Sequence, residues 1–340
     1  MTTLSNNAGN GIQLTDDPQN AVLLCSYSEL TNPGALSSYM KGWEIVWNGI
    51  LTDDGNYAFI ATDAPRETYV LAIAGSLVTT GTLLKDWDTF ANWVLEDLNI
   101  LTHKNWPFAT TANAYITDGA HIGFTNLQNM KDSLKSNLTV TDYLVANAIN
   151  NGKKVIITGH SLGGNIANVF ASYFISYLTT EKYSTDKLSL VSLYTFAAPA
   201  PGNGAFAKDL DAKLLNAWHF QNSLDIIPNF PVADNIYKVA SMYSPQPAAS
   251  AISVIFPNSS NPIRLGEGFI MLSGVLALCG YKQQANNYTI FTPSTKLNPA
   301  YLDNTVGDFF LQAGSQHAVS NYATYLGVSL TIKQASSQYA

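Results

Sequence analysis

KKVIITGHSLGG, residues 153–164, is the stretch that decides the fold. KKVIIT is a short apolar run of the kind that forms a buried β-strand. Ser161 follows between Gly159 and Gly163, and apolar residues then recur at helical spacing from Gly163 to Thr180. A strand, a glycine-bounded serine and a helix in succession are typical of a nucleophile elbow, the sharp turn that exposes a serine hydroxyl.

The residue types around Ser161 fit this interpretation physically. Glycines two positions before and after the serine remove side chains that would clash with the strand and the helix. The start of the helix supplies free N–H groups and a positive dipole end for developing negative charge. The alternative is an ordinary glycine-bounded turn, and the strand before it and the helix after it favour the catalytic interpretation.

The remaining pattern predicts the fold class. Apolar runs at 69–74 and 188–196, and a weaker one at 216–221, predict further strands, while 127–150 and 163–180 have helical spacing. Strands that alternate with helices indicate an α/β fold whose mostly parallel sheet is covered on both faces. We therefore expect a single α/β domain over residues 1–340.

Composition narrows the possible partners. Of 340 residues 46% are hydrophobic and only 12% charged, the net charge is −7, and no basic stripe suggests nucleic acid. The longest apolar run, FIMLSGVLALC at 269–279, falls short of the roughly 20 residues that cross a bilayer, so we interpret it as a buried helix. No histidine pair has metal-ligand spacing, and we expect no metal and no cofactor.

Two further features concern the chain's ends and its sulfur chemistry. Cys25 and Cys279 lie far apart in the sequence, and we expect buried free thiols. The N-terminal residues lack the basic and apolar segments of a Sec-type signal peptide, which leaves the cellular location open. The oligomeric state is also open.

A serine hydroxyl needs a base, and five histidines are available: His103, His121, His160, His219 and His317. In α/β hydrolases the order along the chain is serine, acid, histidine, so the first three come too early. His160 should leave the elbow on another face, and His219 lies in an apolar strand as a core histidine. His317 follows the polar segment 312–316, which we interpret as a turn before a helix, and is the predicted base.

The acid must lie between Ser161 and His317. The candidates include Asp186, Asp209, Asp211, Asp225, Asp234, Glu267, Asp303 and Asp308. Asp225 comes just after a predicted strand, on a loop stiffened by Pro228, where a buried carboxylate can fix the tautomer of the imidazole. Asp209 and Asp211 have the pattern of a solvated helix face, and Asp303 and Asp308 stay open.

At this point the chain resembles the class 3, fungal-type triacylglycerol lipase family. The matching segments, in the family's order, are AHIGF at 120–124, GHSLGG at 159–164, LYTFAAPAPGNG at 193–204, NSLDIIPNFP at 222–231, and His317 with Tyr322. They run through most of the chain, and together they are far more specific than any one alone. The resemblance implies an α/β-hydrolase fold with lid and cap insertions. It also implies a lipid-ester hydrolase with the triad Ser161, Asp225 and His317.

The resemblance also implies two flanking features. Ala74-Gly75-Ser76 occupies the place of the family's oxyanion loop, which makes Ser76 and the backbone N–H of Leu162 the expected oxyanion donors; the family's arginine is Ala74 here. Residues of about 77–106 correspond to the lid, with a fixed core helix as the alternative. The 92 positions (317 − 225) between Asp225 and His317 depart from the compact family pattern. We therefore expect an insertion at about 233–293, which caps the pocket or forms a dimer surface.

Competing functions remain at this stage. A feruloyl-type esterase, a phospholipase A1 and an acyltransferase share the triad, and a non-catalytic lipid-binding module is the distant alternative. A nucleotide-binding loop at Gly202–Ala207 is disfavoured, because Pro199 and Pro201 interrupt the turn and the third glycine is an alanine. The apolar pattern of the lid segment favours long-chain lipid esters.

Overall fold

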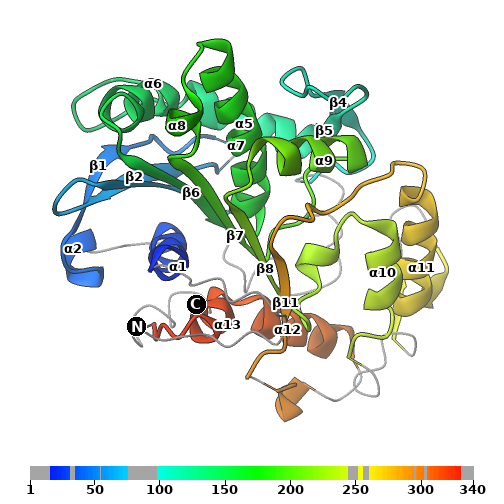
Figure 1. The fold of residues 1–340 in the computed structure, drawn as a ribbon. Coiled ribbons are helices and arrows are strands. Elements are labelled where there is room, and N and C mark those ends of the chain that lie inside the picture. The colour runs from blue at the N-terminus through cyan, green and yellow to red at the C-terminus, as the bar shows by residue number, and fades with distance from the viewer. Residues whose placement is uncertain are drawn as a thin grey trace, which may run out of the picture.

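The structure, a computed structural model, describes residues 16–30, 35–53, 55–75, 98–243, 252–255, 260–294, 296–301 and 305–330. A twisted central sheet runs through it, with helices on both faces (Figure 1). The sheet has seven strands in the order β1-β2-β3-β6-β7-β8-β11. Their bounds are β1 (Trp43–Asn48), β2 (Ala58–Asp63), β3 (Thr68–Ile73), β6 (Lys154–His160), β7 (Val191–Phe196), β8 (Ala217–Asn222) and β11 (Tyr288–Phe291).

The sheet is mostly parallel. Strands β3, β6, β7, β8 and β11 pair in parallel, and β1 and β2 extend this core by antiparallel pairing. The four predicted strands at 69–74, 153–158, 188–196 and 216–221 correspond to β3, β6, β7 and β8. The predicted α/β-hydrolase architecture is therefore confirmed, and the carboxyl ends of the parallel strands meet at one edge.

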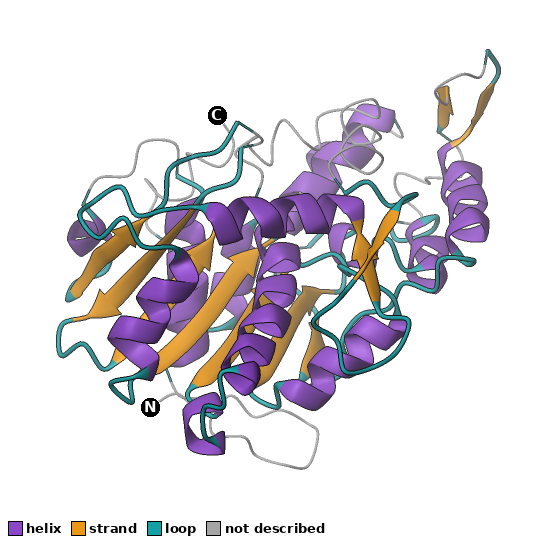
Figure 2. Ribbon diagram, turned by 90° about the horizontal axis from the view of Figure 1, so that it is seen from above, coloured by secondary structure: helices purple, strands orange, loops and turns teal. Residues whose placement is uncertain are grey.

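Helices cover the sheet in two layers, as Figure 1 and the view from above in Figure 2 show. One layer contains α5 (Asp118–Asn129), α6 (Val140–Leu144), α7 (Leu162–Thr180), α8 (Thr185–Leu188) and α9 (Gly204–Lys213). The other contains α1 (Asp17–Ser28), α12 (Val306–His317) and α13 (Val319–Tyr325), and the short α2 (Leu36–Tyr39) lies beside β1. Helix α7 confirms the helix predicted after the serine.

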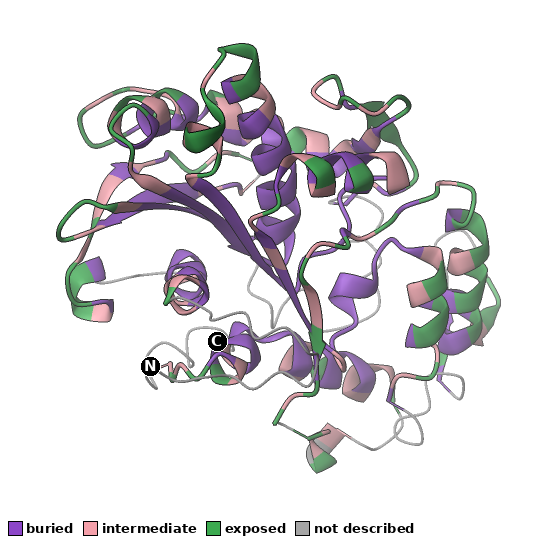
Figure 3. Ribbon diagram, in the orientation of Figure 1, coloured by how far each residue is buried: buried purple, intermediate pink, exposed green. Residues whose placement is uncertain are grey.

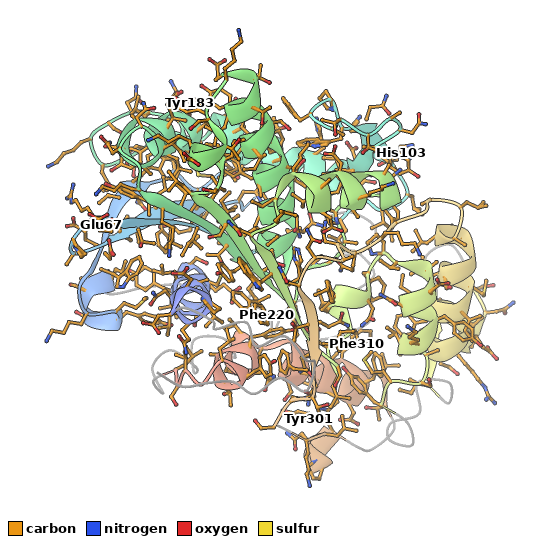
Figure 4. All side chains as sticks on the ribbon, in the orientation of Figure 1. Glu67, His103, Tyr183, Phe220, Tyr301 and Phe310 are labelled. Carbon is orange, nitrogen blue, oxygen red and sulfur yellow. The ribbon has the colours of Figure 1, made fainter. Side chains whose placement is uncertain are left out.

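Apolar side chains fill both interfaces between sheet and helices (Figures 3 and 4). Alternate residues of each strand serve the two sides: Leu71 and Ile157 face the α7 layer, and Val70 and Ile156 face the α1 layer. Phe220 on β8, labelled in Figure 4, packs toward Tyr325 of α13. The strands are buried on both faces, as their continuous apolar runs predict.

The helix predicted over 127–150 is wrong in its middle. Helix α5 ends at Asn129 and α6 begins at Val140, continuing into a π-helical turn over Val145–Ile149. The carboxylate of Asp132 accepts backbone N–H groups from four residues at 2.8 to 3.1 Å: Asn48, Leu134, Lys135 and Ser136. Because the side chain satisfies these amides, a loop replaces the helix there.

Several elements lie outside the main sheet. They are the hairpins β4 (His103–Asn105) with β5 (Tyr115–Thr117) and β9 (Ser253–Ile255) with β10 (Pro262–Arg264), and the helices α10 (Ala233–Val239) and α11 (Leu265–Leu276). Figure 2 shows α11 and its hairpin at the rim of the molecule, beyond the sheet. Thus the expected insertion at 233–293 contains α10, β9, β10 and α11, while its last residues join the central sheet through β11.

The apolar run at 269–279 is helical for most of its length, but the expectation that it is buried is wrong. Phe269 and Leu276 are fully buried, whereas Met271 is 63% and Val275 55% exposed. Helix α11 packs on α10, and Figure 3 shows both buried and exposed residues along it. Among the described helices, none combines the length and apolar character needed to span a bilayer.

Both cysteines are free, as expected. Cys25 is buried in α1 beside Thr158 of β6, with 3.0 Å between Sγ and Oγ1. Burial raises the pKa of the Cys25 thiol far above its ordinary value. Cys279 is only half-buried, which differs from the expectation.

Asp132→Ala should lower the free energy of unfolding by about 2 kcal/mol, because it leaves several loop N–H groups without an acceptor. Burial alone would raise the pKa of Asp132, but its backbone N–H donors lower it well below the ordinary value. The stabilisation should therefore be complete above a pH of about 4 and disappear as the pH falls through the folded pKa. Urea denaturation at several pH values measures it.

The matched control is Asp186→Ala, which truncates an exposed carboxylate in the short helix α8. This variant should stay within about 0.5 kcal/mol of the parent chain. Equal losses in the two variants would contradict the role assigned to Asp132.

Candidate active site

The turn between β6 and α7 has the geometry predicted for the elbow. Ser161 has φ 55° and ψ −128°, which is unusual for a residue with a side chain. A Cβ on Gly159 would lie 2.2 Å from the backbone of Gly163, and one on Gly163 would lie 2.2 Å from the carbonyl oxygen of Ile73. Both glycines are therefore required by close backbone approach, as the sequence predicts.

The backbone of Ser161 is hydrogen-bonded to the sheet. Its backbone N–H donates to the carbonyl of Phe196 at the end of β7, at 2.9 Å. Its side chain lies at the carboxyl edge of the parallel strands, above the first turn of α7. Leu162 is the first residue of that helix, where backbone N–H groups have no partner within the helix.

His317 lies against Ser161, with 2.8 Å between Nε2 and the serine Oγ. It is the last residue of α12, and α13 begins two residues later at Val319. The expectation of a polar turn before it and a helix starting at it is wrong, since residues 312–316 belong to α12. The imidazole is fully buried.

The carboxylate of Asp225 completes the arrangement. It follows β8 directly, and its Oδ2 lies 2.8 Å from Nδ1 of His317. A carboxylate only accepts, so Nδ1 carries the hydrogen and Nε2 is free to take the proton of the Ser161 hydroxyl. The structure thus brings together Ser161, His317 and Asp225, which are 156 and 92 residues apart in sequence.

Two more donors hold Asp225 in its fully buried position. The backbone N–H of Ile227 donates to Oδ1 at 2.9 Å, and the hydroxyl of Tyr322 donates to Oδ2 at 2.7 Å. Burial raises the pKa of Tyr322, and the charge of Asp225 raises it further, so the phenol stays protonated and remains a donor. Three donors therefore satisfy the oxygens of this buried carboxylate.

Other acid candidates make hydrogen bonds away from His317. Asp209 is buried, accepts from the backbone N–H of Thr110 at 2.6 Å, and forms an ion pair with Lys213. Asp211 accepts from the amides of the turn at 285–286. The solvated-face expectation is therefore wrong for Asp209, whereas Asp211 is partly exposed. Each carboxylate anchors a loop. Asp308 lies at the opposite end of α12 from His317, and Asp303 falls outside the described residues.

Two other histidines, His219 and His160, differ in their surroundings. His219 is buried in β8 with Nδ1 2.7 Å from Oγ1 of Thr195, and burial lowers its pKa to about 3, so it is a neutral core residue as expected. His160 does not leave the site. Its ring centroid lies 4.6 Å from that of His317, a proximity that sequence reasoning missed.

Ser76 and most of the expected lid lie outside the described residues. The neighbouring Gly75 is described, and a Cβ there would be 3.3 Å from the carbonyl oxygen of His160 and 3.7 Å from Cβ of Ser161. The loop that leads to Ser76 therefore departs from a point directly against the elbow.

Comparisons with known proteins agree with this geometry. The family model described as Lipase (class 3) matches residues 82–235. A secreted mono- and diacylglycerol lipase of Fusarium solani is 25% identical over 189 residues, 55% of this chain and 46% of its own length. A phospholipase A1-II of Oryza sativa subsp. indica is 36% identical over 78 residues, 23% of this chain and 18% of its own.

The crystal structure of M37 lipase shares the fold, with a TM-score of 0.68, 21% identity and 92% of each chain covered. This chain spans about half the length of the Fusarium relative and less of the rice one. The matched segment includes the elbow and the Asp225 loop, where the predicted motifs stand. Residues 82–235 thus resemble the class 3 lipase family, and the chain shares its α/β-hydrolase fold with a lipase of known structure.

Proposed function

We propose that this chain is a serine carboxylic-ester hydrolase that acts on lipid esters. The observation that carries the proposal is the continuous chain of hydrogen bonds from the Ser161 hydroxyl through His317 to Asp225, with both contacts at 2.8 Å. Nucleophile, base and orienting acid stand in the order and geometry that acyl transfer requires.

The first half of the reaction forms an acyl-enzyme. The oxygen of Ser161 attacks the ester carbonyl while Nε2 of His317 takes its proton, and the carbonyl oxygen becomes an oxyanion. Asp225 stabilises the resulting imidazolium and holds its orientation. The tetrahedral species then collapses, the bond to the alcohol breaks, and the alcohol leaves with the proton from His317.

The second half returns the serine. Water replaces the alcohol, His317 removes a proton from it, and the new hydroxyl attacks the acyl carbonyl. Collapse breaks the bond to Ser161, which regains its proton, and the carboxylic acid departs. Preorganised hydrogen-bond donors stabilise both tetrahedral species; we assign the backbone N–H of Leu162 and, by resemblance, the hydroxyl of Ser76.

The substrate class follows from the family and its relatives. The names of the matched relatives cover mono- and diacylglycerols and phospholipids, and we propose a glycerolipid ester as the substrate. A phospholipase A1 activity is the second candidate, favoured by the 36% identical segment. Hydrolysis rates for triacylglycerol, diacylglycerol and phosphatidylcholine of equal acyl length separate these possibilities.

The exposed side of α11 supports contact with a lipid surface. Residues 268–281 carry no charge, and Ile270, Met271 and Val275 are exposed by 44%, 63% and 55%. Surface helices of soluble domains usually place polar residues outward, whereas lipid-bound helices do not. We propose that the cap at 233–293 contacts the lipid aggregate and that the segment at 77–106 is a lid over the site.

Ser161→Ala should reduce kcat by roughly a millionfold, and Asp225→Asn by about ten-thousandfold through loss of the correct tautomer. A soluble short-chain ester gives the rates, and a fluorophosphonate probe should label the parent chain at Ser161. Asp308→Asn is the matched control and should remain within about threefold. A Ser161→Ala variant that keeps a tenth of the activity would refute the proposal.

Ser76→Ala should lower kcat by about 100- to 1000-fold, because an oxyanion donor acts mainly in the transition state. The KM for the same soluble ester should change little. An unchanged kcat would remove Ser76 from the oxyanion site and leave the triad untouched.

Met271→Glu combined with Val275→Glu should weaken binding to phosphatidylcholine vesicles by about tenfold or more, since burial of each side chain is worth roughly 1.5–3 kcal/mol. Hydrolysis of the soluble ester should be unaffected. Leu215→Glu is the control, because Leu215 is 73% exposed and precedes β8, at the edge opposite the triad. Equal losses in both variants would exclude α11 as the contact surface.

A further inference from the structure

His160 joins two segments that the mechanism above does not connect. Its Nδ1 lies 2.7 Å from the carboxylate of Glu29, at the end of α1, and its Nε2 lies 2.9 Å from the backbone carbonyl of His317. The side chain of His160 is 1% exposed and that of Glu29 15%. A second acid–histidine pair thus ends on the backbone of the catalytic imidazole.

The hydrogen-bond chemistry fixes the charge of this pair. A backbone carbonyl only accepts, and so does a carboxylate. A neutral imidazole has one N–H and cannot serve both partners, whereas an imidazolium donates to each. In this arrangement His160 therefore carries one more proton than a neutral buried histidine. The negative charge of Glu29 balances the positive charge of the imidazolium.

The electrostatics agree with this requirement. Burial by itself lowers the pKa of His160, but the charge and hydrogen bond of Glu29, the charge of Asp225 and the His317 carbonyl raise it above the ordinary 6.5. The titratable groups that face the ring come from four elements: Glu29 of α1, Asp225 after β8, His317 of α12 and Tyr322 of α13.

We propose that His160, as an imidazolium paired with Glu29, is a positioning residue that holds the backbone of His317 against Ser161. This inference rests on the proposed function. His317 ends α12 and stands immediately before the start of α13, so its carbonyl has no continuing helix to bond. The Glu29–His160 pair supplies the missing donor and links α1 to the base.

A merely structural role would predict different behaviour. If His160 only filled space, its loss would lower stability without changing the pH dependence of catalysis. If His160 positions His317 through a charged hydrogen bond, its deprotonation should remove one of its two hydrogen bonds, to Glu29 or to the carbonyl of His317. Activity should then fall as the pH rises through the folded pKa of His160.

The first experiment uses His160→Leu in the full chain. Loss of the carbonyl contact should lower kcat for a soluble ester by about 100-fold with little change in KM, the effect expected when a reacting group shifts by about 1 Å. His219→Leu is the matched control: it removes a histidine of β8 that is also buried, and kcat should stay within about threefold.

The second experiment, Glu29→Gln, separates charge from geometry and does not depend on His160→Leu folding. The amide can donate to Nδ1 of a neutral imidazole, while Nε2–H still donates to His317. Activity at neutral pH should fall less than about tenfold, while the loss of activity at high pH should disappear because no charge remains to be lost.

Nitrogen NMR of histidine-labelled protein reads the protonation state directly, without reference to activity. At pH 6 His160 should be doubly protonated in the parent chain and singly protonated in Glu29→Gln. The stability difference between the two should be full below about pH 6.5 and shrink as the pH rises through the raised pKa.

A singly protonated His160 at pH 6 in the parent chain would overturn the inference. So would superimposable pH profiles of the parent and Glu29→Gln, or equal losses of kcat in His160→Leu and the His219 control. If the parent chain hydrolyses no ester and Ser161 escapes the fluorophosphonate probe, the proposed function fails instead. The NMR result still decides whether the charged pair exists.

Discussion

The close approach of three backbone segments at the elbow is the constraint on which the site depends. The end of β3, the end of β6 and the first turn of α7 meet so tightly that a single methyl group on Gly163 would lie 2.2 Å from the carbonyl of Ile73. This contact fixes where α7 begins and forces Ser161 into its positive φ. The strained turn persists because the sheet on one side and the helix on the other leave it no alternative.

Parallel topology then explains how residues far apart in sequence converge. Every parallel strand ends at the same edge, so the residue after β6 and the loop after β8 are neighbours in space although 64 positions (225 − 161) separate Ser161 from Asp225. His317 reaches the same edge from the end of α12. Helix α12 ends at His317, where the imidazole faces both Ser161 and Asp225. Tyr322 of α13 donates a hydrogen bond to the carboxylate of Asp225.

Features that repeat along the chain could be predicted, and features that depend on one distant partner could not. Apolar runs and spacing identified β3, β6, β7, β8 and α7, and the elbow glycines followed from sterics. The break near Asp132 and the burial of Asp209 escaped prediction, because periodicity does not reveal which backbone amides a carboxylate will accept. The same limit hid the outward apolar side of α11, whose residues look like any core helix.

His160 shows why such contacts matter to the chemistry. Its position beside the nucleophile was evident from GHSLGG, yet its partners, Glu29 and the carbonyl of His317, are 131 and 157 residues distant. Two carboxylates lie near His317. Asp225 is buried and accepts from neutral donors, whereas Glu29 lies at the margin of the site and pairs with His160. A net charge inside a dry site is costly unless it is matched locally. The charge of Glu29 is matched by His160, whereas the charge of Asp225 is free to stabilise a proton on His317.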